Sequence, residues 1–207
     1  GFENEEKILE TTAYRVSTAV KSYTFYTYNA AMVLLRSDTW KDTDKVKRKS
    51  ATLYTGQDEG EEKAKLTLNY SALADTVKTS TVFIYNSVTE MLQLSVTYKD
   101  EVMIDQANTL LFIQAYKGGA TFGNLRKSLS NYSGEPGEEK IQWTRAFRSN
   151  GSVSSFTKFN YVNDVLHDSA ATKYTAVGAS YTSSVSNYTG FENEEKILET
   201  TAYRVST

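Results

Sequence analysis

The feature that most constrains this sequence is an exact repeat of one segment at its two ends. Residues 1–18 and residues 190–207 both read GFENEEKILETTAYRVST, so every position of the first segment recurs unchanged in the second. Divergent duplication leaves substitutions, so an unchanged repeat of this length is a direct copy of the first segment. The sequence therefore divides into an N-terminal extension (1–18), a central body (19–189) and a copy of the extension (190–207).

Three interpretations of the repeat are open at the level of the sequence. In the first, the N-terminal extension is a donor strand that completes the sheet of a neighbouring subunit, and the C-terminal copy is a self-complementing strand of its own subunit. In the second, domains repeat in tandem with the segment 1–189 as one period, and the copy begins the next domain. In the third, the copy is an incidental duplication. The first two interpretations place the segment at the junction between successive domains.

The repeated segment has the pattern of a β-strand. From Ile8 onward it is rich in β-branched and aromatic residues that alternate between two faces, as in strands. A helical stripe fits some of the same residues, but the threonine and valine content favours the strand. Glu10 interrupts the apolar face. The side chains expected to fill a neighbouring sheet are the large apolar ones of both copies: Ile8, Leu9, Tyr14, Val16, Ile197, Leu198, Tyr203 and Val205.

The central body predicts an all-β fold. Residues 64–70 and 92–98 alternate strictly between apolar and polar side chains, which is the pattern of strands with one buried face. Asn150-Gly151 predicts a type I′ turn that joins two strands in a tight hairpin. About ten short strands separated by turn residues predict a β-sandwich or jelly-roll-like domain, with the terminal segment as a donor-type strand. No shift in composition divides residues 19–189, so one domain is expected.

The composition excludes several kinds of active site. The sequence has no cysteine and one histidine, which excludes disulfides, cysteine nucleophiles and zinc sites built from these residues. It also lacks a glycine-rich phosphate loop. We therefore expect neither an enzyme nor a bound cofactor. Two acidic loops hold the only metal candidates, whose spacing differs from the 12-residue calcium loop and indicates weak calcium binding at best. These candidates are Asp42, Asp44, Asp58 and Glu61.

Charge and hydropathy argue against nucleic-acid and membrane partners. The net charge is −2, so no overall positive field attracts nucleic acid. The basic run 45–49 is interpreted as an exposed edge protected by lysine. The longest apolar stretch, 30–35, is far shorter than the roughly 20 residues that a membrane-spanning helix needs. Four Asn-x-Ser/Thr sequons, three of them expected in loops, are candidate glycan sites: Asn69, Asn131, Asn150 and Asn187.

By the arrangement of its terminal segment alone, the sequence resembles the donor-strand-complemented subunits of pilins and related surface filaments. The resemblance implies a structural subunit of an extracellular, self-assembling filament, whose partners are identical subunits. The sequence departs from pilins in lacking their disulfide pair. Two alternatives stay open. One is a jelly-roll virus coat protein that uses the basic run to contact its genome, and the other is one repeat of a tandem-domain surface adhesin.

Overall fold

The computed structural model describes residues 7–16, 19–41, 44–71, 76–104, 113–115, 125–192 and 194–204. Every element within them is a β-strand, which confirms the all-β prediction. The strands are β1 (Glu10–Tyr14), β2 (Val20–Tyr28), β3 (Leu34–Trp40), β4 (Arg48–Thr55), β5 (Lys63–Tyr70), β6 (Val77–Tyr85), β7 (Leu92–Tyr98), β8 (Val102–Ile104), β9 (Ile113–Ala115), β10 (Arg126–Ser133), β11 (Lys140–Phe147), β12 (Val153–Val162), β13 (Val165–Tyr174), β14 (Ser180–Thr189) and β15 (Lys196–Ala202).

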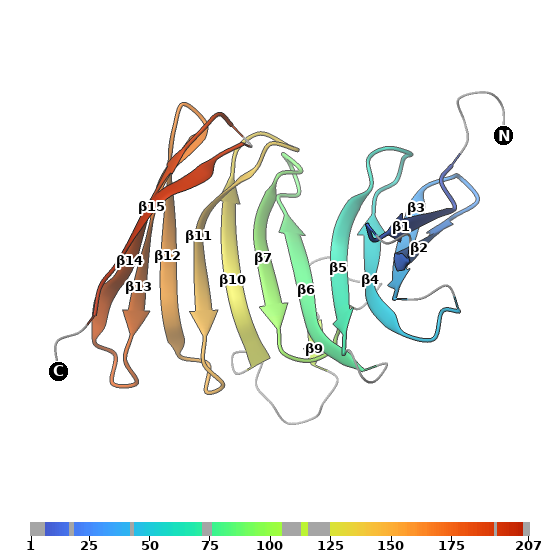
Figure 1. Ribbon diagram of the computed structural model, residues 1–207. Helices are drawn as coiled ribbons and strands as arrows, with labels where there is room; N and C mark the ends of the chain where they lie inside the picture. The colour runs from blue at the N-terminus through green and yellow to red at the C-terminus, as the bar shows by residue number, and fades with distance from the viewer. Residues whose placement is uncertain are drawn as a thin grey trace. The chain divides into compact units, whose positions relative to one another are not determined.

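The strands follow one another across an antiparallel sheet in the order of the sequence (Figure 1). The order of the 13-stranded sheet is β1 to β7 followed by β10 to β15, while β8 and β9 pair with each other. A jelly roll needs Greek-key connections, which bring strands distant in sequence side by side. Among the described strands no such pairing occurs, so the finer prediction of a jelly-roll-like sandwich is not confirmed. The chain separates into two compact units, one from 1–83 with 98–118 and the other from 84–97 with 119–207.

A repeat unit of four strands recurs along this order: β1 to β4, then β5 to β7 with β10, then β11 to β14, with β15 in the position of the next first strand. Lys7, Lys63, Lys140 and Lys196 occupy the same position at the start of each unit, and the spacing from Lys7 to Lys63 equals that from Lys140 to Lys196. The spacing between Lys63 and Lys140 is longer, because β8, β9 and their connections are inserted there. The strands β1, β5, β11 and β15 are therefore equivalent, and the repeated terminal segment supplies the first and the last of them.

The pairing registers repeat with the units. The first strand of each unit pairs with the second so that a threonine faces a threonine: Thr11 with Thr24, Thr67 with Thr81, and Thr144 with Thr157. The last strand of each unit pairs with the first strand of the next in a second shared register: Thr52 with Thr67, Ser130 with Thr144, and Ser186 with Thr200. The strands β5 and β11 hold both registers at once, whereas β1 holds only the first and β15 only the second.

Few of the described side chains are buried, and four of these are serines: Ser37, Ser80, Ser95 and Ser169. The apolar ones are Val33, Ala51, Leu66, Val82, Val96, Tyr98 and Val102. Ser80 in β6 is 0% exposed. Its hydroxyl donates to the carbonyl of Asp100 at 2.7 Å and accepts the backbone N–H of Val102 at 3.0 Å. This hydroxyl therefore ties the segment that leads into β8 to the main sheet.

The predicted hairpin at Asn150-Gly151 joins β11 to β12, but its turn is not type I′. That turn needs positive φ at two central residues, and here Gly151 alone has it, with φ of 83°. The Asn150 side chain instead accepts the backbone N–H of Ser152 at 3.0 Å. A two-residue turn with positive φ at both positions occurs between β12 and β13, at Asn163 (50°) and Asp164 (66°).

We expect Ser80→Ala to lower the free energy of unfolding by about 1–3 kcal/mol, because it leaves the buried N–H of Val102 without its acceptor. The matched control is Ser180→Ala, which changes an exposed serine of β14 and should shift stability by less than about 0.5 kcal/mol. Urea unfolding followed by circular dichroism measures both changes. Equal stability of the two variants would show that the Ser80 hydroxyl does not hold this segment.

Candidate functional site

Each four-strand unit contains the same hydrogen-bonded clamp at one hairpin. A glutamate in the hairpin accepts the backbone N–H of a leucine at the start of a neighbouring strand. The three pairs are Glu62 with Leu34 (2.8 Å), Glu139 with Leu92 (2.8 Å) and Glu195 with Leu166 (3.0 Å). A tyrosine before the hairpin bonds a serine of that strand: Tyr54 with Ser37, Tyr132 with Ser95, and Tyr188 with Ser169, all at 3.0–3.1 Å. Each clamp therefore fixes three strands in one register.

The sequence carries a signal for this clamp that the terminal repeat obscured. The three hairpins read YTGQDEGEEK from Tyr54, YSGEPGEEK from Tyr132 and YTGFENEEK from Tyr188. They share a tyrosine, a hydroxyl residue, a glycine and the ending Glu-Glu-Lys. A side chain at Gly134 or Gly190 would meet a backbone oxygen within 2.7–2.8 Å, so only glycine fits there. A search for short diverged repeats would have found the unit.

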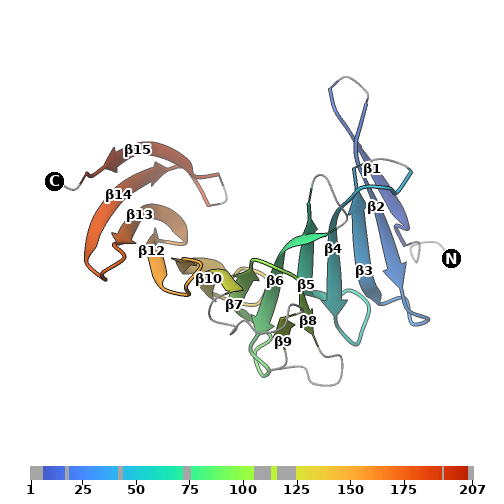
Figure 2. The same ribbon diagram turned by 90° about the horizontal axis from the view of Figure 1, so that it is seen from below.

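The two copies of the terminal segment supply the first and the last strand of the strand order. Figure 2 shows each of them beside its neighbouring strand. β1 pairs with β2, and β15 pairs with β14. Their predicted assembly residues are exposed, from 49% for Tyr203 to 108% for Val16. The exposed set is Ile8, Leu9, Tyr14, Val16, Ile197, Leu198 and Tyr203, while Val205 lies outside the described residues. Neither copy is inserted in a groove of its own sheet, and the role of these residues in assembly stays a prediction.

β1 and the residues before it contact β2 through two backbone carbonyls and one carboxylate. The carbonyl of Leu9 accepts the N–H of Tyr26 at 2.9 Å, and the carbonyl of Ile8 accepts the hydroxyl of Tyr28 at 2.9 Å. The Glu10 carboxylate accepts the hydroxyl of Tyr23. This hydrogen bond raises the pKa of the tyrosine above its ordinary value of 10.0. The glutamate that interrupts the apolar pattern is therefore a hydrogen-bond acceptor across the sheet.

β15 contacts β14 through a different set of atoms. The N–H of Tyr203 donates to the carbonyl of Ser183 at 2.9 Å. Glu199, the equivalent of Glu10, accepts the side-chain amide of Asn187 through Oε1 at 2.8 Å. The hydroxyl of Thr200 lies 2.9 Å from that of Ser186. The glutamate of the segment thus contacts a different neighbouring strand in each copy.

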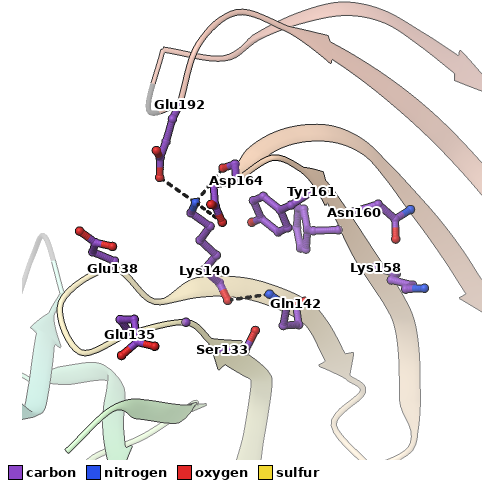
Figure 3. A pocket seen from close by; sticks show the side chains of 12 residues that line it. Ser133, Glu135, Glu138, Lys140, Gln142, Lys158, Asn160, Tyr161, Asp164 and Glu192 are labelled. Carbon is purple, nitrogen blue, oxygen red and sulfur yellow. Dashed lines mark hydrogen bonds and ion pairs between the residues drawn. The ribbon is translucent and has the colours of Figure 1, made fainter.

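A cavity of about 570 Å³ lies in the compact unit formed by 84–97 and 119–207, beside the clamp hairpin that joins β10 and β11. Figure 3 shows the Lys140 side chain extending between Glu192 and Asp164. Its Nζ lies 2.7 Å from Glu192 Oε1 and 3.2 Å from Asp164 Oδ1, and the hydrogen bond to Glu192 is the main cause of the raised pKa of Lys140. Lys7 forms the equivalent ion pair with Glu59, in the hairpin between β4 and β5. This lysine therefore links the first strand of a unit to the hairpin at its end.

The metal and glycan candidates have different outcomes. Asp44, Asp58 and Glu61 join no cluster of three possible metal ligands among the described residues, and Asp42 lies outside those residues. Asn69 lies in β5, as the strand pattern of 64–70 predicts. Asn131 lies in β10 and Asn187 in β14, which corrects the expectation that three sequons lie in loops. Strands rich in hydroxyl residues resemble loops in composition. Asn150 alone lies in a turn, and no described helix is long and apolar enough to cross a membrane.

Comparisons with known proteins leave the family open. No protein-family model matches the chain, and no curated protein matches it. The chain is similar to the crystal structure of TcdB2-TccC3, with a TM-score of 0.30 and 12% identity, covering 93% of this chain and 12% of that one. A protein with unknown function (BF3112) from Bacteroides fragilis NCTC 9343 gives a TM-score of 0.25 and 7% identity, covering 79% and 91%. Such TM-scores establish neither a shared fold nor a shared function.

The clamp makes stability depend on pH. The backbone N–H of Leu34 holds the pKa of Glu62 below its ordinary value of 4.5. A carboxyl whose pKa is lower in the folded state stabilises the fold above its unfolded pKa, and this contribution is lost as pH falls through the folded pKa. We expect Glu62→Gln to lower stability at neutral pH and to reduce the loss of stability on acidification. Urea unfolding at pH 7 and below 4.5 measures both effects. The control is Glu61→Gln, at the exposed neighbouring position, which should follow the parent protein at every pH.

Proposed function

We propose that this protein is a structural subunit of an extracellular, self-assembling filament, joined to identical subunits through its terminal strands. The observation that carries the proposal is the equivalence of the two copies with β5 and β11. Those interior strands have a neighbour on each side. Among the described strands, β1 pairs only with the strand that follows it, and β15 only with the strand that precedes it. An interior strand such as β11 pairs on both sides, and each terminal copy forms one of these two pairings and leaves the other side open.

The exposure of the terminal strands supports this proposal. All seven residues of β15 are exposed, whereas every residue of the equivalent β11 except Arg145 is at least half-buried. A strand at the edge of a sheet leaves a row of N–H and C=O groups unpaired, and another chain can pair with them. Ile8, Leu9, Ile197 and Leu198 add apolar side chains to these edges. Burial of each contributes roughly 1.5–3 kcal/mol before ordering costs, which suits assembly without disulfides.

One observation favours a second candidate, a repeat of a tandem-domain surface adhesin. β15 occupies the position of the first strand of a further unit, so covalently joined copies of the segment 1–189 would continue the same sheet. The mass of the native protein under denaturing conditions separates the two candidates. A filament subunit has the mass of one period, whereas a tandem adhesin has the mass of many.

Chains with only one copy of the segment test the filament proposal. Residues 1–189 lack the strand that covers β14, and residues 19–207 lack the strand that covers β2. We expect both chains to form oligomers whose mass grows with concentration, measured by light scattering after size separation. The full chain covers both edges with its own copies. It should assemble only near the roughly millimolar effective concentration of a tethered segment.

A peptide with the sequence of residues 190–207 is the control for specificity. It should bind the open edge of either single-copy chain and return the oligomers to monomers, while a peptide of the same composition in scrambled order should not. If both single-copy chains stay monomeric with unchanged circular dichroism, the terminal strands do not join subunits and the filament proposal is wrong.

A further inference from the structure

We propose that subunits join by strand exchange in one defined register: β15 of one copy replaces β1 of the next and pairs with its β2. This inference rests on the proposed function and specifies its interface. The partner is a second copy of this chain, because β15 has the sequence of the strand that β2 already binds. The register follows from that of β1, which sets Thr11 against Thr24 and Ala13 against Ser22. The exchanged strand therefore sets Thr200 against Thr24 and Ala202 against Ser22.

The backbone of the segment can serve both neighbours at once. In an antiparallel pair, the hydrogen-bonding groups of successive residues point to alternate sides. The hydrogen bond from the Tyr26 N–H to the Leu9 carbonyl shows that the backbone N–H and C=O groups of residues 9, 11 and 13 point toward β2. The bond from Tyr203 to Ser183 shows that residues 199, 201 and 203 face β14. In β15 the groups that correspond to 9, 11 and 13 are those of 198, 200 and 202, and these point to the open edge.

The side chains of the segment are also compatible with both neighbours. Glu10 accepts a hydrogen bond from the Tyr23 hydroxyl of β2 through Oε2, and Glu199 accepts one from the Asn187 side-chain amide of β14 through Oε1. A shared strand places one carboxylate between both donors and uses both of its oxygens. This accounts for a glutamate in the middle of an otherwise apolar and hydroxyl-bearing strand.

An interior strand already shows this double use. In β11 the hydroxyl of Thr144 lies 2.9 Å from that of Ser130 in β10, as Thr200 does with Ser186. On its other side, the carbonyl of Ile141 accepts the hydroxyl of Tyr161 in β12 at 3.0 Å, as that of Ile8 does from Tyr28. β11 therefore combines the β15 contacts with the β1 contacts in one strand.

The recurring lysine position completes the match within the chain. Lys7 pairs with Glu59 and Lys140 with Glu192, and the two pairs have the same spacing along the sequence. Lys196, at the same position, is exposed in β15. In the exchanged assembly it takes the place of Lys7 beside Glu59 of the next copy.

Two equivalent proline substitutions in the full chain test the exchange. Ala202→Pro removes an N–H that points to the open edge of β15, and we expect this variant to stay monomeric at every concentration. Ala13→Pro removes an N–H that points toward β2. It therefore weakens the pairing of β1 with β2, and β1 is the strand that β15 of another copy must displace. We expect Ala13→Pro to assemble at about tenfold lower concentration than the parent chain, since one lost hydrogen bond corresponds to about one order of magnitude. Assembly of Ala202→Pro like the parent would overturn the exchange.

A disulfide capture tests the register, because the chain has no cysteine of its own. Full chains carrying Thr200→Cys are mixed under oxidising conditions with chains carrying Thr24→Cys. We expect a covalent dimer, because paired strands bring Cα atoms within the range that disulfides bridge. Thr27→Cys, on the opposite face of β2, should give no dimer with the same partner. Equal capture at Thr24 and Thr27 would overturn the register.

The position of capture separates exchange from simple stacking of edges. If Thr200→Cys is captured by Thr12→Cys at the outer edge of β1, and not by Thr24→Cys, the copies stack without exchange. If single-copy chains assemble but Thr24→Cys captures nothing, the exchange is wrong and the filament proposal stands. If no chain assembles and nothing is captured, both are wrong.

Discussion

The backbone hydrogen bonding between successive antiparallel strands is the interaction on which this structure depends. Only seven large or small apolar side chains are buried among the described residues, so side-chain burial alone does not specify the arrangement. The registers of the first and last strands recur from unit to unit, including the bulge before the final aromatic residue at Tyr14, Tyr70 and Phe147. A sheet built in this way is stable where both sides of a strand are paired and open to further pairing where one side is not.

The glutamate clamps explain how such a sheet keeps its register with a small core. A one-residue slip in register moves every side chain to the other face of a sheet. The clamp carboxylates of Glu62, Glu139 and Glu195 each accept the N–H at one position of the neighbouring strand, and a slip would break this hydrogen bond. Because each clamp acts within its own unit, the insertion that carries β8 and β9 leaves the clamp of Glu139 with Leu92 intact.

The structure gives Glu10 and Glu199 a role that the sequence pattern did not indicate. In the sequence, a charged residue within an apolar face weakens the prediction of an inserted strand. In the structure, the carboxylate accepts a hydrogen bond from Tyr23 in one copy and from Asn187 in the other, so each copy has a polar partner on its own neighbouring strand. A donor strand recognised by polar partners discriminates against off-register pairing more strongly than one recognised by burial alone, since each misplaced polar group loses its hydrogen bond.

The sequence by itself determined the exact repeat, the all-β class, the strand character of the terminal segment and the hairpin after β11. These follow from local patterns, because alternation of apolar and polar side chains reports strand conformation and face. It did not determine which strands are neighbours, that the two copies are the first and last strands of the strand order, or that Asn131 and Asn187 lie on strands. Alternation with period two is the same for any partner, so the neighbours of a strand are fixed only when the hairpins, clamps and hydroxyl pairs act together in the folded sheet.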